Sequence, residues 1–314
     1  MTVTFPSPPV GLLVLGASLT QMRRRWGVSR ALAAAAARVS AAELADGESG
    51  RAAPPQASLD RLLRLYCQPP HVHEILAGWA AAGRDEAPGH TLTDAAVGWQ
   101  PRLAALEGCA LRIRVFSDRA VPALVRTPAY AAGLERLRPA TVLDHSSARP
   151  GQRPGVFDHH TWEHAEVILD APVLTRRVAG APGMPDPLAD QLTHLCTVVD
   201  ERRADIRIIP AATARPQRSQ GSDLLQLTLP GPHRPAVWVE ESSASATYRN
   251  GPPGMEQQHL LDELAARTAD GAGSATLLHE AAANCTAHTL PPVQRPAHTA
   301  GPRHALASSS RRQP

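Results

Sequence analysis

The sequence predicts an α+β fold, in which a small all-α domain precedes a mixed α/β domain and a disordered C-terminal tail. Three observations predict it. Apolar residues recur at helical spacing over residues 11–82, whereas short runs that alternate apolar and charged residues indicate strands within residues 103–284. Residues 285–314 are rich in Pro, Ser, Thr, Arg and His and cannot bury a core. Residues 83–102 mix Gly, Asp, Pro and Thr and are expected to form a linker.

The length and composition are consistent with two folded domains. The chain has 314 residues, of which 43% are hydrophobic and only 4% aromatic, so Ala, Leu and Val must fill most of the core. The net charge of +3 is carried by arginine, since the sequence contains no lysine. A weak positive charge permits an acidic polymer as a partner without requiring one.

Cysteine usage and the N-terminal region indicate a cytoplasmic protein. Cys67, Cys109, Cys196 and Cys285 are far apart and form no C-x-x-C pair, which argues against a disulfide framework and a Cys-rich zinc site. The apolar run Val10–Leu15 is too short to span a membrane and lacks the preceding basic residues of a secretory signal. We therefore expect reduced thiols and no membrane partner.

Five short helices are expected in the N-terminal domain. The first has an apolar stripe that ends near Trp26, and Gly27 interrupts the chain after it. Ser29 and Ser40 are suited to cap the second and third helices, the third of which should end at Gly47. Ser58 is expected to cap the fourth helix, and the fifth should follow Pro69 and Pro70 and carry Val72, Ile75, Leu76 and Trp79.

The second domain should combine strands and helices. Strands are expected at residues 111–115, 166–174, 205–210, 224–229 and 236–240 because these runs are short, apolar or alternating. Helical spacing of apolar residues predicts helices at 122–137, 188–199, 255–267 and 275–283. Residues 144–158 are typical of a loop.

The first three expected helices have the layout of a helix-turn-helix. In this motif the last of three helices lies in the DNA major groove and its first residues reach base edges. Here that helix begins at Ser40, so Ser40, Ala41, Ala42 and Glu43 would face bases. Arg30 and Arg51 would hold backbone phosphates of double-stranded DNA. Residues 16–51 contain six arginines against three acidic residues, so this short segment alone has a charge of +3.

Several segments together resemble a known family. Residues 15–19, 27–29, 39–40, Leu44 and 50–51 resemble the Cro/C1-type, xenobiotic-response-element helix-turn-helix of actinobacterial regulators. Residues 114–134, 166–180, 191–195, 205–214 and 236–241 resemble, in order and spacing, the antitoxin-like C-terminal domain of that group. The resemblance covers residues 11–284. It implies DNA binding, a homodimer and a small protein partner encoded nearby, but no chemistry for the C-terminal domain.

The groove helix departs from this pattern in ways that leave two interpretations open. Arg30 stands where the family has a glutamine, and Gly47 replaces a core aliphatic residue. Ala41 and Ala42 offer no hydrogen bonds, and Glu43 and Asp46 are acidic near phosphate, although glutamate can accept from cytosine N4. The chain is therefore either a DNA-binding regulator or an antitoxin-like protein-interaction module whose helix-turn-helix no longer binds DNA.

One motif suggests an enzyme. His160, Glu163 and His164 spell H-x-x-E-H, which on a helix would place two histidines on one face with a glutamate as base, as in a zinc hydrolase. The flanking residues instead predict a loop that continues into a strand, which favours a surface loop. We therefore expect no catalytic residues, no metal and no cofactor.

Overall fold

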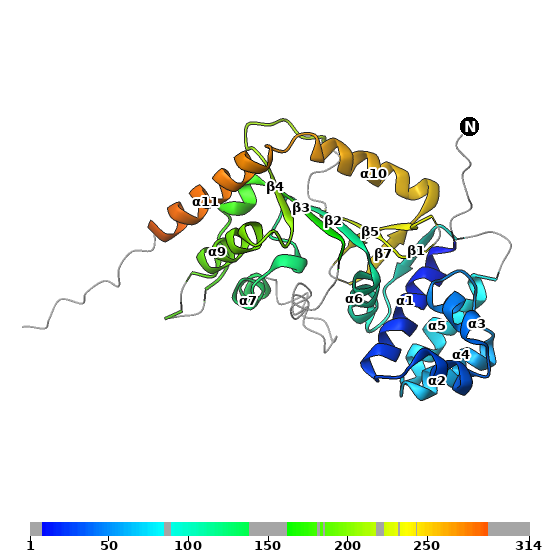
Figure 1. The fold of residues 1–314 in the computed structure, drawn as a ribbon. Helices are drawn as coiled ribbons and strands as arrows, with labels where there is room; N and C mark the ends of the chain where they lie inside the picture. Colours follow the sequence, from blue (N-terminus) through cyan, green and yellow to red (C-terminus); the bar gives the residue numbers. More distant parts are fainter. Residues whose placement is uncertain are drawn as a thin grey trace, which may run out of the picture.

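The architecture comes from a computed structural model of the 314-residue chain, shown in Figure 1. It describes residues 8–84, 89–137, 162–180, 183–184, 186–217, 223–231, 233–242 and 244–287. No helix among these residues is both long and apolar enough to cross a membrane. The expected disordered tail lies almost wholly outside the described residues; its first three residues, 285–287, are the end of a helix.

The N-terminal part is all-helical, as predicted. Its elements are α1 (Val10–Arg25), α2 (Arg30–Ala37), α3 (Ala41–Glu48), α4 (Gln56–Leu65) and α5 (Pro70–Ala82). Ser29 and Ser40 cap α2 and α3 with their side chains, which confirms both expected helix starts. The expected cap at Ser58 is wrong, because α4 begins two residues earlier, after Pro55.

The rest of the chain forms a seven-stranded sheet with helices on both faces (Figure 1). The strands are β1 (Thr91–Asp94), β2 (Arg112–Ser117), β3 (His164–Asp170), β4 (Asp205–Ile209), β5 (Asp223–Thr228), β6 (Ala236–Glu241) and β7 (Ala246–Arg249). The helices are α6 (Trp99–Cys109), α7 (Pro128–Arg136), α9 (Pro187–Asp200), α10 (Gly251–Ala265) and α11 (Gly271–Ala287), with 3-10 turns η1 (Ala123–Val125) and η3 (Ala171–Leu174).

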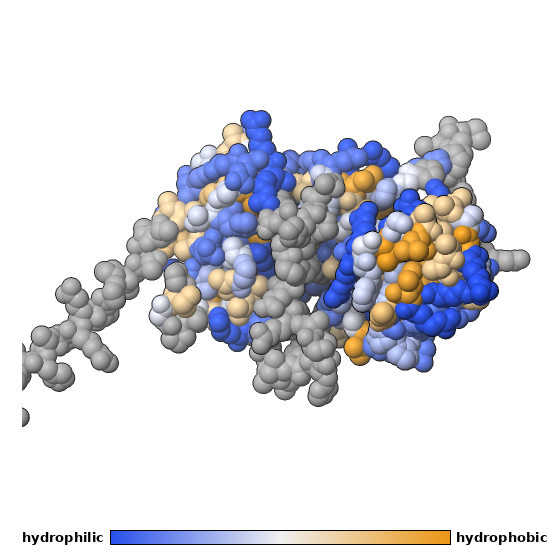
Figure 2. Space-filling model, turned by 60° about the horizontal axis from the view of Figure 1, so that its bottom comes forward, coloured by the Kyte–Doolittle hydropathy of each residue, from blue (hydrophilic) through white to orange (hydrophobic). Residues whose placement is uncertain are grey.

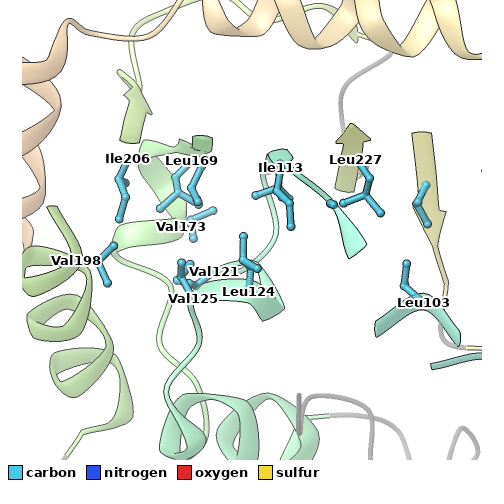
Figure 3. Packing of buried hydrophobic residues seen from close by; sticks show 14 of the residues in the cluster. Leu103, Ile113, Val121, Leu124, Val125, Leu169, Val173, Val198, Ile206 and Leu227 are labelled. Atoms are coloured by element: carbon cyan, nitrogen blue, oxygen red, sulfur yellow. The ribbon is translucent and has the colours of Figure 1, made fainter. Parts of the chain in front are cut away.

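The sheet order is β1-β7-β6-β5-β2-β3-β4. Strands β2, β3 and β4 are parallel, whereas β1, β7, β6, β5 and β2 pair antiparallel. Because side chains alternate along a strand, the strands β2, β3, β4 and β5 each contribute to two cores, one on either face of the sheet. The larger core, part of which Figure 3 shows, includes Ile113, Leu227, Ile206 and Val198. On the other face, α10 packs Leu261 and Leu264 onto a smaller core.

Two predicted elements of this domain are interrupted or shortened in the structure. The helix expected over residues 122–137 is interrupted, because Thr127 caps a new helix whose first residue is Pro128. Proline is favoured at that first position, since it lacks the N–H that would otherwise be unpaired there. The strand expected over residues 166–174 ends at Asp170, where Pro172 lies in a 3-10 turn.

The expected linker at residues 83–102 is wrong. It contains β1, which pairs with β7 from Thr91↔Arg249 to Asp94↔Ala246, and the first turn of α6. Arg102 is buried and donates from Nε and Nη2 to Asp94, each at 2.7 Å. A pairing strand and a buried ion pair hold residues 91–102 against the sheet, which their polar composition did not indicate.

Helix α1 belongs to both parts of the molecule. Leu12, Leu15 and Leu19 pack in the core of the N-terminal helices. Val14 and Ala17, on another face of α1, pack with the sheet domain and α6. The two parts are therefore joined through a shared helix.

Candidate nucleic-acid interface

Helices α2 and α3 form a tight helix-turn-helix. The turn is made at Arg38, whose φ of 58° is left-handed, and the next helix starts at Ser40. Ser40 Oγ accepts from the Glu43 backbone N–H at 3.1 Å, and Glu43 Oε2 accepts from the Ser40 N–H at 2.7 Å. This reciprocal capping box fixes where α3 begins.

Glycines let α3 lie directly against α1. A Cβ at Gly16 would meet the Glu48 and Gly47 carbonyl oxygens at 2.6 Å, so α1 and α3 touch through their backbones. Gly50 has a φ of 70°, and a Cβ there would lie 2.8 Å from the Leu12 oxygen. A Cβ at Gly47 would meet Pro54 Cγ at 3.1 Å, so Pro54 fills the space that we expected an aliphatic residue to need.

Glu48 is a buried carboxylate at the end of α3, and its side chain is 4% exposed. Arg23 of α1 donates to it from Nε at 2.5 Å and from Nη2 at 3.0 Å. Arg30 of α2 donates from Nε to Glu48 Oε2 at 3.1 Å. The hydrogen bond and charge of Glu48 raise the pKa of Arg23 against the opposing effect of burial. One carboxylate thus ties all three helices together.

The residues expected to face bases lie at the exposed start of α3. Ser40, Ala41, Ala42 and Glu43 are all exposed. The capping hydrogen bonds to Ser40 lower the pKa of Glu43, which keeps its carboxyl ionised. Because Glu43 Oε2 accepts from its own helix start, part of its negative charge is already compensated by the N-terminal end of α3.

Arg30 lies at the exposed start of α2. It is the first residue of α2, and its side chain is 52% exposed. Its Nε is engaged by Glu48, while no described residue accepts from its two Nη groups. Glu48 therefore orients the guanidinium and leaves its outer donors available.

Arg51 is placed less favourably. Its Nε donates to Asp46 Oδ1 at 2.9 Å, and Nη2 contacts the same oxygen. Both side chains are more than two-fifths exposed, so the pair is worth little, about 0–1 kcal/mol. A phosphate would have to displace Asp46 from Arg51, but the cost is small.

Three further arginines counted in the charge of residues 16–51 were not among the predicted DNA contacts, and the structure describes them as well. Arg24 and Arg25 at the end of α1, and Arg38 in the turn, are exposed and form no ion pair with any described residue. It also assigns Arg23 and Glu48, which both contribute to the charge of +3 counted over residues 16–51, to a buried ion pair. One feature of the sequence agrees with the burial of Glu48 but does not predict it alone. Glu48 follows Leu44 by four residues, so both lie on the same face of α3.

The H-x-x-E-H motif does not form a helical face. Residues 162–163 are irregular and His164 is the first residue of β3, so Glu163 and His164 do not lie on a helix. Glu163 accepts from Arg234 at 3.0 Å. His160 lies outside the described residues. No group of three or more potential metal ligands occurs within the part of the chain that the structure describes.

Two protein families match the chain, one in each part of the fold. Residues 14–76 match the family described as "Helix-turn-helix domain". Residues 100–280, more than half of the chain, match the family described as "Domain of unknown function (DUF5753)". The chain belongs to the DUF5753 family. No curated protein and no solved structure matches it.

The DUF5753 match corresponds to the sheet domain from α6 to α11, and the helix-turn-helix match corresponds to α1–α5. The boundary between them falls in the segment that holds β1. This protein therefore has a helix-turn-helix of the kind that DNA-binding regulators carry, built onto a DUF5753 domain through the shared helix α1.

Proposed function

We propose that this DUF5753 protein is a sequence-specific DNA-binding regulator that inserts the start of α3 into the major groove. The observation that carries this proposal is the arrangement of Arg30, whose Nε donates to Glu48 while no described residue accepts from its Nη groups, in a helix-turn-helix whose α3 has an exposed first turn. Phosphate contacts of this kind set the register of a protein on DNA, and the groove residues then read bases.

Glu43 is the proposed base-reading residue that can still accept hydrogen bonds after it has capped its own helix. Its Oε2 caps the helix, and a carboxylate has further lone pairs that can accept from cytosine N4. Ala41 and Ala42 are small and apolar, which suits contact with a thymine methyl group. Few residues of one α3 reach bases, so we further propose that a homodimer presents two copies to half-sites about one helical turn apart.

Selection from a pool of randomised DNA duplexes tests the proposal. The full-length protein should enrich a motif with two related halves. Glu43→Gln keeps a side chain that can complete the capping box but removes the charge, so it should change the preferred bases. Arg136→Ala, an exposed arginine on α7, is the matched control and should select the wild-type motif. Failure of the wild-type protein to enrich any motif would contradict sequence-specific binding.

A second candidate function is an antitoxin-like protein-interaction module. The observation that favours it is an exposed apolar strip on α2, where Leu32 is 58% exposed and Ala31 and Ala35 are exposed beside it. Figure 2 shows hydrophobic residues gathered on the N-terminal helical part next to strongly hydrophilic ones. A small protein encoded nearby would cover this strip. Co-expression with such proteins followed by size-exclusion chromatography should give a complex that Leu32→Asp abolishes.

A further inference from the structure

The two edges of the sheet differ in how their backbone groups are bonded. Strand β4 forms one edge, next to α11, and β1 forms the other, next to α1 (Figure 1). At the β4 edge, the Ile208 N–H donates to Ser274 Oγ at 3.0 Å, and the Ile208 carbonyl accepts from the Ala269 N–H at 2.9 Å. Residues 269–274 therefore bind the backbone of Ile208 and cover this edge, which is one of the ways in which proteins protect a sheet edge.

The register of β1 identifies which of its backbone groups face outward. Strand β1 pairs antiparallel with β7, and the same register continues one residue beyond the strands, where the Asn250 N–H donates to the His90 carbonyl at 2.9 Å. Along an antiparallel strand, residues that are hydrogen-bonded to the neighbouring strand alternate with residues that are not, so His90 and every second residue after it bond to β7. The N–H and C=O groups of Thr91 and Thr93 therefore point away from the sheet.

The outward edge of β1 is open at these two residues. Thr91 and Thr93 are both exposed, and no described residue forms a backbone hydrogen bond with their outward-facing groups. Residues 91–93 include neither a charged side chain nor a proline, which are common means of keeping a sheet edge from pairing with another strand. The next residue, Asp94, is buried and accepts from Arg102, so its charge does not protect the edge.

We propose that the β1 edge pairs with the same edge of a second copy of this chain, which joins the two seven-stranded sheets around a two-fold axis. Antiparallel pairing centred on Leu92 sets Thr91 opposite the partner's Thr93 and Thr93 opposite the partner's Thr91. Each of these two pairs exchanges both of its N–H···O hydrogen bonds, so all the outward-facing backbone groups of the two residues are used. A second copy fits because the edge is its own complement in this register, as a two-fold interface requires, and no like charges face each other.

The surroundings of β1 fit this register. The half-buried Leu92 packs against the larger core, so its side chain and that of the partner's Leu92 lie together on the core side of the joined sheet. Before β1, the Gly89 carbonyl accepts from the Val10 N–H at 3.0 Å, which ends the open part of the edge. The residue that would face Gly89 lies beyond the end of the partner's β1, where the chain turns because the Ala96 N–H donates to Asp94 Oδ1 at 3.2 Å.

This interface deepens the proposed function and rests on it, since it supplies the surface through which the proposed homodimer forms. Strand β1 packs against α1, the helix shared by the sheet domain and the helix-turn-helix. A two-fold axis at β1 therefore holds two copies of the helix-turn-helix in a fixed relation to each other, as binding to two half-sites requires. The interface is small, so we expect a reversible dimer that forms as the protein concentration rises.

Analytical ultracentrifugation of the full-length protein without DNA, over a range of concentrations, tests the interface. The wild-type protein should change reversibly from monomer to dimer. Thr91→Lys/Thr93→Lys places lysine opposite lysine in both pairs and should raise the dissociation constant of the dimer at least about fivefold, because like charges directly opposite each other are destabilising. The matched control is Thr91→Lys/Thr93→Glu, which places lysine opposite glutamate in both pairs and should dimerise at least as tightly as the wild type.

Both variants should keep a melting temperature close to that of the wild type, because both side chains are exposed, so a lost dimer cannot be attributed to unfolding. A wild-type protein that stays monomeric at the highest concentration, or a dimer that the double-lysine variant does not weaken, overturns the proposal. Weaker dimerisation of the lysine–glutamate variant than of the double-lysine variant contradicts the register. A monomer that still enriches a DNA motif refutes this interface alone, whereas a β1-dependent dimer that enriches none refutes the proposed DNA binding alone.

Discussion

The ion pair between Glu48 and Arg23 is a buried interaction that links α1 and α3 of the helix-turn-helix. Replacing Glu48 by Gln keeps the shape and removes the charge, so Arg23, whose side chain is 12% exposed, is left without a counter-charge. Breaking a buried pair in this way costs about 3–5 kcal/mol. The exposed Arg30 contributes less than about 1 kcal/mol to this loss, because water screens it.

The free energy of unfolding of Glu48→Gln should therefore fall by about 3–5 kcal/mol, a large part of the 5–15 kcal/mol typical of folded domains. Urea denaturation followed by circular dichroism measures the change. Asp46→Asn is the matched control, since it breaks an exposed arginine pair on the same helix and should cost less than about 1 kcal/mol. Equal losses in the two variants would refute the reasoning that burial of Glu48 sets the magnitude.

Three further predictions follow from the structure. Asp46→Asn frees Arg51 and removes a negative charge beside the proposed phosphate contact, so the affinity for DNA, measured by fluorescence anisotropy, should rise. The rise should be at most about fivefold, because the exposed pair is worth at most about 1 kcal/mol. Weaker binding would contradict this prediction. Burial raises the pKa of Asp223 above 3.8, so Asp223→Asn should raise the melting temperature at pH 7. That gain should shrink, not grow, as calorimetry is repeated at lower pH, because protonation of the wild-type carboxyl removes the cost of burying its charge. Burial raises the pKa of Cys109, Cys196 and Cys285, whereas Cys67 is exposed. One thiol should therefore react rapidly with Ellman's reagent, and this fast reaction should be absent in Cys67→Ser. Two rapidly reacting thiols would contradict this packing.

The sequence predicts the parts of the fold that depend on local interactions. Helical spacing and the Ser29 and Ser40 caps place α2 and α3 correctly, because a cap acts within three residues of itself. The strands of residues 205–209 and 236–241 are apolar enough to be recognised alone. Each of these signals lies within one element.

Elements that depend on distant partners were missed. Strand β1 has four residues and is defined by its pairing with β7, which lies more than 150 residues later in the chain. The shared role of α1 likewise cannot be read from its sequence, because Leu12 and Val14 are equally apolar and only the fold assigns them to different cores. For the candidate site, exposure at Ser40 and Arg30 was predictable from cap positions. The pairing of Arg30 with Glu48 and of Arg51 with Asp46 required the geometry.

The most direct test of the central proposal is binding of the full-length protein to its own upstream DNA at two salt concentrations, beside an Arg30→Ala/Arg51→Ala variant. Each phosphate contact contributes about 0.9 to the slope of log affinity against log salt. Wild-type binding should weaken as salt rises, and the double variant should bind more weakly with a slope smaller by about 2. Arg136→Ala should leave both quantities unchanged. No wild-type binding at low salt, or an unchanged slope in the double variant, would contradict the proposal.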